Sequence, residues 1–165
     1  MNKQQSRIHH YVPQWYQRRF LHPGQGKFYY LDLRPEKKVS ASGVKYQRRA
    51  LLRWGPPSCF CKDDLYTLKL GNLSTDDIEK HFFGAIDSHG KEAVELFSDY
   101  NGIRKGLNLN KAFQVLPQYM DAQRFRTPRG LDFLRSTIDV RDHNVMLLAM
   151  RQLYRFHTTM WMEGI

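Results

Sequence analysis

The hydrophobic pattern of this chain changes at residues 71–74, where a Gly-Asn-Leu-Ser turn separates two stretches of different periodicity. Before the turn, bulky β-prone residues occur in short runs broken by proline and glycine, which is typical of short strands. After the turn, apolar residues recur with a period near 3.6, which predicts amphipathic helices. We therefore expect an α+β fold, in which a small N-terminal sheet of short strands with a short helix packs on a C-terminal array of about four helices. Two subdomains, 1–72 and 73–165, would form one compact unit.

The N-terminal stretch contains few residues with a regular pattern. Pro13 suits the first position of a short helix that runs to Phe20, because its missing N–H has no partner to lose there. Residues 44–54 are ambiguous between strand and loop. Short strands are predicted at residues 8–12, 27–33 and 65–70. Apolar side chains on both faces of the second of these predict that it is covered on both sides.

The C-terminal stretch predicts helices with identifiable ends. The first begins at Ser74, which forms a pattern close to a capping box with Asp77, and it ends at Asn101-Gly102. Three further helices are predicted at residues 109–124, from Thr127-Pro128 onward, and from Asp139 through Tyr154.

The excess positive charge lies in the N-terminal stretch. Residues 1–70 contain 14 Lys and Arg against 4 Asp and Glu, which gives +10, whereas residues 71–165 contain 12 of each. A localised field of this sign favours polyanions, of which nucleic acid is the commonest in cells. We therefore expect a nucleic-acid-binding face formed by Arg18, Arg19, Lys37, Lys38, Lys45, Arg48, Arg49 and Arg53. Interleaved aromatic residues are candidates for base stacking: Trp15, Phe28, Tyr29, Tyr30, Tyr46 and Trp54. Two alternatives to nucleic-acid binding are that these charges form an ordinary solvated surface, or that they bind an acidic protein partner in a protein-interaction module.

Several classes of protein are disfavoured by composition. No run of 18 apolar residues is present, so no membrane span is expected, and the polar N-terminus does not resemble a secretory signal. Cys59 and Cys61 are too close for an easy disulfide and lack the spacing of a zinc site, so buried thiols in a cytoplasmic protein are expected. The cofactor is unknown, and a divalent metal is expected only under the nuclease or phosphodiesterase alternative that uses His9 or His10. Residues 157–165 still look structured, so we expect the chain to be the front part of a longer protein.

Several motifs resemble one known family. The opening His9-His10-Tyr11-Val12-Pro13-Gln14-Trp15-Tyr16 is similar to that of the bacterial family called domain of unknown function 4238. Further similarities are Leu65-Tyr66-Thr67, Ile78-Glu79 with Ile86-Asp87, and Gln123-Arg124-Phe125-Arg126-Thr127-Pro128. The chain departs at Gln17, where the family usually has Leu, and it lacks a downstream Ser-Asp-x-Pro motif. The resemblance implies no particular activity.

His9 and His10 are candidate catalytic residues together with Arg126. Two histidines before an apolar pair and proline also resemble the first strand of His-metal-finger nucleases, in which a histidine activates water beside a divalent metal. Such nucleases need an Asn in the following loop, and residues 3–71 contain none. The alternative is that one imidazole forms hydrogen bonds in the core and pins the strand, while the other faces solvent.

Arg126 lies at a helix-to-helix corner with two more arginines. The free N–H groups of the helix that begins at Pro128 would suit an anion such as phosphate. Alternatively, Thr127 only caps that helix and Arg126 pairs with a carboxylate such as Asp121 or Asp87. The residues alone leave both interpretations open.

Overall fold

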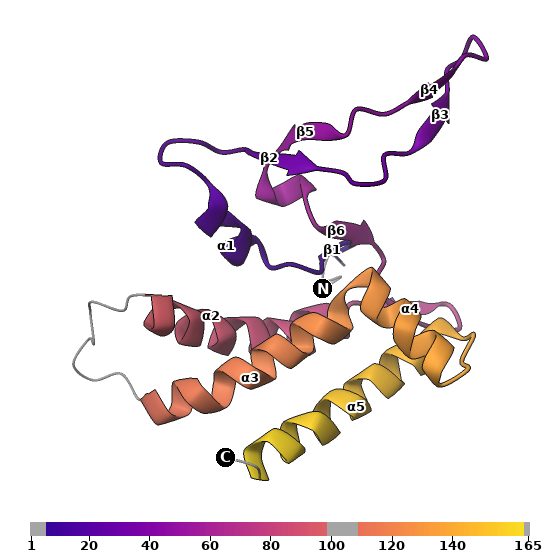
Figure 1. Ribbon diagram of the computed structural model, residues 1–165. Helices are drawn as coiled ribbons and strands as arrows, with labels where there is room; N and C mark the ends of the chain where they lie inside the picture. The colour runs from indigo at the N-terminus through magenta and orange to yellow at the C-terminus, as the bar shows by residue number, and fades with distance from the viewer. Residues whose placement is uncertain (1–5, 99–108, 164–165) are drawn as a thin grey trace. The chain divides into compact units, whose positions relative to one another are not determined.

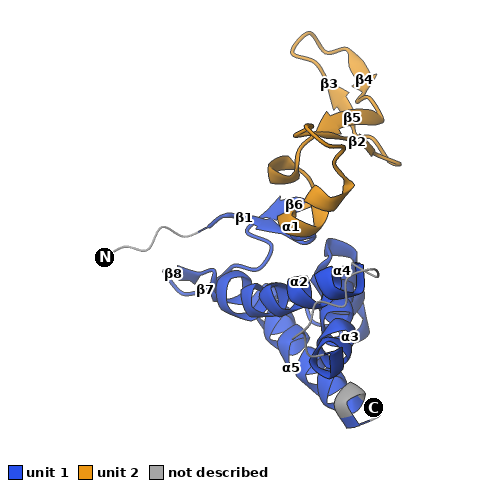
Figure 2. Ribbon diagram, turned by 90° about the vertical axis from the view of Figure 1, so that its left-hand side faces the viewer, with its two compact units in different colours: residues 1–13, 61–165 blue, residues 14–60 orange. Residues whose placement is uncertain are grey.

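The computed structural model describes residues 6–98 and 109–163 of the chain. These residues belong to two compact units, Met1–Pro13 with Cys61–Ile165 as the first and Gln14–Phe60 as the second (Figure 2). The expected α+β class is confirmed, with short antiparallel strands in the N-terminal part and helices in the C-terminal part. The strands pair as four separate two-stranded sheets instead of one small sheet. Residues 61–72, which we grouped with the basic segment, lie in the same unit as the helices.

Two of the four sheets belong to the first unit. The strand β1 (Ile8–His10) pairs antiparallel with β6 (Cys61–Asp63), and β7 (Leu68–Leu70) pairs with β8 (Leu73–Thr75). The strand expected near residue 8 is confirmed. The strand expected at residues 65–70 is wrong in its first half, because Leu65 and Tyr66 form a buried turn before β7 begins.

The helices of the first unit follow in sequence order: the π-helix η3 (Ile78–Phe83), α2 (Gly84–Ser98), α3 (Leu109–Arg126), α4 (Pro128–Thr137) and α5 (His143–Glu163). Helix α3 lies between α2 and α5 and contacts both (Figure 1). The expected array of about four helices is thereby confirmed. The predicted helix end at Asn101-Gly102 lies outside the described residues.

Two predicted helix starts are wrong. Ser74 lies in β8, so it cannot cap a helix that begins near Ile78. The last helix begins four residues after Asp139, which lies in a turn with φ of 50°. Asp142 caps it instead, because its Oδ1 accepts a hydrogen bond from the Val145 N–H (2.9 Å). At α5 a nearby residue with the same capping chemistry, Asp142, thus takes the place of the predicted Asp139.

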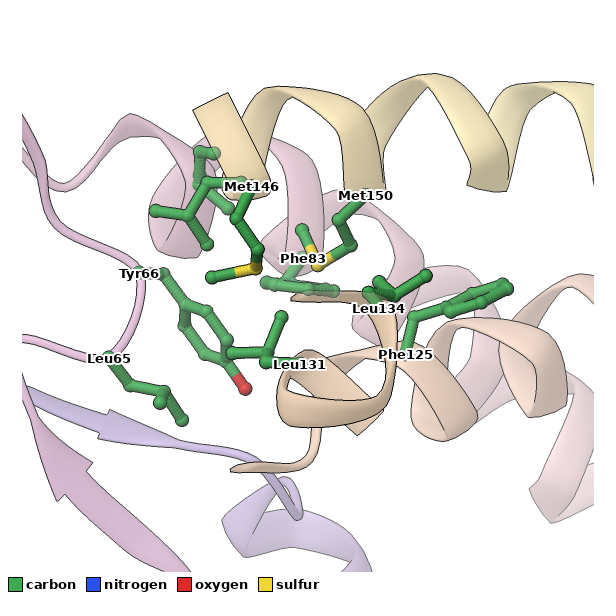
Figure 3. Close-up of a cluster of buried hydrophobic side chains, with 10 residues drawn as sticks. Leu65, Tyr66, Phe83, Phe125, Leu131, Leu134, Met146 and Met150 are labelled. Carbon is green, nitrogen blue, oxygen red and sulfur yellow. The ribbon is translucent and has the colours of Figure 1, made fainter. Parts of the chain in front are cut away.

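One apolar cluster holds the first unit together (Figure 3). It joins the turn after β6 to η3, α3, α4 and α5, and Tyr66 packs on Phe83 with ring centroids 4.7 Å apart. Burial of each large apolar side chain stabilises the fold by about 1.5–3 kcal/mol. The cluster consists of Leu65, Tyr66, Ile78, Phe83, Phe125, Leu131, Leu134, Met146, Leu147 and Met150. It fixes the turn that contains Tyr66 against the end of α3, where the candidate site lies.

The second unit consists of short elements. They are α1 (Gln14–Gln17), the 3-10 turn η1 (Arg18–Phe20), β2 (Phe28–Leu31), β3 (Lys37–Val39), β4 (Lys45–Gln47), β5 (Leu51–Trp54) and the 3-10 turn η2 (Pro56–Ser58). Strand β2 pairs with β5, and β3 pairs with β4, both antiparallel. The helix expected after Pro13 is confirmed as the two successive turns α1 and η1.

Only one face of the β2–β5 pair is covered. Tyr30 stacks on Trp54 with ring centroids 5.5 Å apart, and Phe60 packs edge-on against Tyr30. On the opposite face Tyr29 is 70% exposed and Leu31 is 57% exposed. The expectation that residues 27–33 form a strand covered on both sides is therefore wrong, because alternation in an apolar run does not reveal whether the second face has a partner.

The close approach of α2 and α3 generates a first prediction. A Cβ at Gly90 would overlap the Tyr119 ring, so Gly90→Ala should destabilise the protein by about 1–3 kcal/mol through overpacking. Gly84, at the start of the same helix, leaves ordinary van der Waals space for a Cβ, with Glu79 O the nearest atom at 3.6 Å.

Urea unfolding of both variants measures the difference. Gly84→Ala is the matched control, and it should be neutral or stabilising by up to about 1 kcal/mol because alanine is the better helix former. Equal effects at the two positions would contradict the close packing at Gly90.

Candidate functional site

Arg126 is the last residue of α3, and its side chain is 1% exposed. Its guanidinium donates through Nη1 to Asp87 Oδ1 (2.6 Å) and through Nη2 to the His10 carbonyl (2.8 Å). Its own carbonyl accepts a hydrogen bond from the Tyr66 hydroxyl. With the Gln123 amide oriented so that its nitrogen faces the Tyr11 carbonyl, the Gln123 oxygen accepts a further bond from Arg126 Nη1 (3.2 Å). One arginine thus connects β1, α2, α3 and the turn before β7.

The π-helix η3 delivers two more neighbours to this arginine. In a π-helix the hydrogen bonds join residues i and i+5, so residues about one turn apart, such as Glu79 and Phe83, lie on one face. Asp87, in the first turn of α2, continues that face. The Arg126 guanidinium carbon lies 4.4 Å from the centroid of the Phe83 ring, and Arg126 Nη2 lies 3.9 Å from Glu79 Oε2. We call Arg126, Asp87, Glu79 and Tyr66 the Arg126 cluster.

The Arg126 cluster contains one cation and two carboxylates. Burial raises the pKa of Glu79 to about 7, and the nearby charge of Asp87 adds to this effect while that of Arg126 opposes it. Burial also raises the pKa of Asp87, although the Arg126 charge and hydrogen bond oppose that change. Because Asp87 is the closer partner, the pair Arg126–Asp87 is neutral, and an ionised Glu79 would be an additional buried charge.

The corner after Arg126 is a capped helix start. Thr127 Oγ1 accepts a hydrogen bond from the Gly130 N–H (2.9 Å), and Pro128 occupies the first position of α4. Arg126 pairs with Asp87, whereas Asp121, the other predicted partner, lies 3.3 Å from His157 Nδ1. These contacts favour a cap and an internal ion pair over a phosphate site at this corner.

His9 is fully buried in β1. Its Nε2 lies 3.0 Å from the Ser6 carbonyl, which can only accept, so Nε2 carries the proton. Its Nδ1 accepts a hydrogen bond from the Tyr66 N–H (2.8 Å), and the two rings stack. Burial lowers the pKa of His9, which keeps the ring neutral. Both nitrogens are engaged, so these contacts favour the interpretation in which His9 pins the strand.

The predicted catalytic residues lie close together in a closed arrangement. His10 is half-buried and contributes its carbonyl to Arg126, whose guanidinium is shielded from solvent. Among the described residues, no group of three His, Cys, Asp or Glu side chains is arranged to hold a metal ion. A hollow of about 210 Å³ between α2 and α3 is lined by His89, Glu92 and Lys111, none of which is a predicted site residue. The geometry of the Arg126 cluster is that of a structural brace.

Sequence reasoning missed Tyr66 and Gln123 as members of this arrangement. Gln123 lies three residues before Arg126 on α3, so helical spacing alone would place both on one face. Tyr66 offers no such signal, because its hydroxyl and its backbone N–H meet partners 60 and 57 residues away.

The predicted nucleic-acid-binding residues all lie in the second unit. Arg48 is half-buried, with its guanidinium carbon 4.8 Å from the centroid of the Trp54 ring. The other seven are exposed: Arg18, Arg19, Lys37, Lys38, Lys45, Arg49 and Arg53. Of the interleaved aromatic residues, Tyr29 and Tyr46 are at least half exposed, while the Tyr30 and Trp54 rings stack on each other.

A family model described as Protein of unknown function (DUF4238) matches residues 8–155. The chain belongs to this DUF4238 family. No curated protein and no solved structure matches the chain. None of the described helices combines the length and the apolar character that crossing a bilayer requires.

The DUF4238 motifs of this chain meet inside the first unit. The carbonyls of His10 and Tyr11, from the opening motif, accept hydrogen bonds from Arg126 and Gln123, which belong to the motif Gln123-Arg124-Phe125-Arg126-Thr127-Pro128. Thr127 caps α4 in the same motif. The hydrogen bonds of His10, Tyr11, Gln123, Arg126 and Thr127 thus give these motif residues a role in joining β1, α3 and α4.

Removal of the Arg126 guanidinium should be strongly destabilising. Arg126→Met leaves Asp87 and Glu79 buried without their cation, which should lower the free energy of unfolding by about 3–5 kcal/mol. Arg124→Met, two residues earlier and exposed, should change it by less than about 0.5 kcal/mol. Urea unfolding followed by circular dichroism measures both, and similar losses in the two variants would contradict the bracing role of Arg126.

The raised pKa of Glu79 predicts that Glu79→Gln stabilises the fold, and that this stabilisation depends on pH. A carboxyl whose pKa is about 7 in the folded chain and 4.5 by default stabilises the fold below about pH 4.5, and this contribution is lost as the pH rises to about 7. Glutamine stays neutral, so between about pH 4.5 and pH 7 the free energy of unfolding of the variant should rise relative to that of the wild type by up to about 1 kcal/mol per pH unit.

Urea unfolding at pH 5 and pH 7.5 tests this gain. Glu92→Gln, at an exposed position on α2, is the control. A Glu79→Gln effect that is the same at both pH values would show that the carboxyl is not held in its protonated form.

Proposed function

We propose that this DUF4238 chain binds nucleic acid through its second unit, Gln14–Phe60. The observation that carries the proposal is the local charge: this unit contains ten Lys and Arg against Asp32 and Glu36 only, a net charge of +8. The first unit contains 16 Lys and Arg against 14 Asp and Glu, a net charge of +2. The excess is therefore concentrated in the 47 residues with the smallest core.

The cations of the second unit have few internal partners. Nine of the ten are exposed, and among the described residues Lys38 is the member that forms an ion pair, with Glu36 at 3.6 Å. In the first unit, by contrast, buried or half-buried carboxylates engage cations directly, as Asp87 does with Arg126 and Asp76 with Lys80. Charges left unpaired on a surface are available to phosphates.

Exposed rings accompany these cations. The Arg53 guanidinium carbon lies 5.7 Å from the centroid of the Tyr29 ring, and both side chains are exposed on the same face of the β2–β5 pair. An aromatic ring beside a guanidinium can stack on a base while the charge contacts the adjacent phosphate. This combination supports nucleic acid over a featureless polyanion.

Fluorescence anisotropy with labelled DNA and RNA oligonucleotides tests the proposal. Each phosphate contact contributes about −0.9 to the slope of log affinity against log salt, so eight contacts would give about −7 between about 50 and 200 mM salt. Exchange of three exposed cations, Arg19→Glu, Arg49→Glu and Arg53→Glu together, should weaken binding by about 100-fold and reduce the slope by about 3.

A charge-matched variant in the first unit provides the control. Arg141, Arg151 and Arg155 are also exposed, and their joint exchange to Glu changes the net charge by the same amount. It should weaken binding by less than about threefold if the second unit is the binding surface. Absent or salt-insensitive binding by the wild type, or equal losses in the two triple variants, would reject the proposal.

A further inference from the structure

Strands β3 and β4 form the far end of a single hairpin that starts with β2 and β5 (Figure 1). Hydrogen bonds from the Asp32 N–H to the Ala50 carbonyl (2.8 Å) and from the Arg48 N–H to the Glu36 carbonyl (3.0 Å) continue the ladder between the two strand pairs. Five residues, 32–36, lie opposite three residues, 48–50, which is a bulge of two residues. We call residues 36–48, beyond this bulge, the arm.

The arm is exposed on both of its faces. All six residues of β3 and β4 are exposed, including the apolar Val39 (62%) and Tyr46 (50%). A two-stranded ribbon with neither face covered is marginally stable in water, so the arm gains order when something surrounds it. With a rise of about 3.4 Å per residue, the five residues from the bulge to the turn extend about 17 Å.

The cations of the arm also lie on both faces. Lys37 is paired with Gln47, and Lys45 is paired with Val39, two residues along each strand. Residues that are paired or two apart share a face, so Lys37 and Lys45 lie on the same face. Lys38 lies on the opposite face, directly across from Tyr46. A flat partner would contact one of these faces and leave the other cations in water. A ligand with negative charge on two sides of the ribbon satisfies both faces at once.

Resting on the proposed function, we infer that the arm inserts into the major groove of double-stranded DNA. That groove is about 12 Å wide, admits a two-stranded ribbon, and has a phosphate backbone along each wall. With its two faces directed at the two walls, the ribbon presents Lys37 and Lys45 to one phosphate backbone and Lys38 to the other. The major groove of an RNA duplex is too narrow for such a ribbon, and a single strand needs only one stacking face.

Anisotropy measurements with the full chain compare three ligands of one sequence: duplex DNA, single-stranded DNA and duplex RNA. Duplex DNA should bind at least about tenfold more tightly than the other two. Methyl green, which occupies the major groove, should displace the protein, and distamycin, which occupies the minor groove, should not. Equal affinity for all three ligands, or displacement by distamycin alone, would overturn the inference while leaving the proposed function standing.

A shortened arm separates this inference from the proposed function. Residues 37–47 are replaced by Asn-Gly, which closes a two-residue turn between the paired Glu36 and Arg48. This variant should lose the preference for duplex DNA but retain weak, salt-dependent binding to all three ligands through the remaining cations. An unchanged preference would overturn the inference, and absence of salt-dependent binding by the wild type would overturn the proposed function as well.

A second variant tests the same contact without deletion. Joint exchange of Lys37, Lys38 and Lys45 to Gln keeps the hairpin length and removes only charge. The salt slope should fall by about 3 on duplex DNA and by less than about 1 on single-stranded DNA. Equal reductions on both ligands would show that these lysines contact phosphates without entering a groove.

Discussion

The first unit of this protein depends on one buried guanidinium. A charge moved out of water costs several kcal/mol unless close partners replace its hydration, and Arg126 finds them in Asp87 and in the His10 carbonyl. These partners lie 39 and 116 residues away in the sequence, so the compensation exists only when α2, α3 and β1 are all in place. Apolar contacts, such as that of Phe83 with the guanidinium, add stability, but they are not directional and would allow one element to shift along another. The directed hydrogen bonds of Arg126 fix how β1, α2 and α3 align.

The same constraint explains the state of the neighbouring groups. His9 must be neutral, because its Nδ1 accepts from the Tyr66 N–H and a protonated ring could not accept. Glu79 is pushed toward its protonated form, because Asp87 already neutralises Arg126. Groups with shifted pKa values often mark active sites, but a shift caused by burial inside a closed brace has the same origin without any access for a substrate.

The sequence predicts features whose cause is local and misses those whose cause is distant. The Thr127 cap and the helices were predictable, because a cap or an apolar stripe involves residues within one or two turns. Strand β6 has three residues and pairs with β1 more than 50 positions away, so it is too short for a hydrophobic period in the sequence to predict it. At the candidate site, the sequence placed His9 and Arg126 among the important residues. It could not distinguish a phosphate from Asp87 as the partner of Arg126, because that choice depends on the packing of α2 against α3.

The distribution of charge separates the two units more sharply than their secondary structure does. The first unit pairs some of its charges internally, as Arg126 with Asp87, and is nearly balanced, whereas the second has two carboxylates for ten cations. Like charges within a Debye length of about 8 Å repel one another, and this repulsion opposes the compact state. The second unit has little buried apolar surface to offset that cost, since its hairpin leaves Tyr29 and Leu31 exposed on one face. A bound polyanion would supply the missing negative charge, and this electrostatic argument supports the proposed binding of nucleic acid by the second unit.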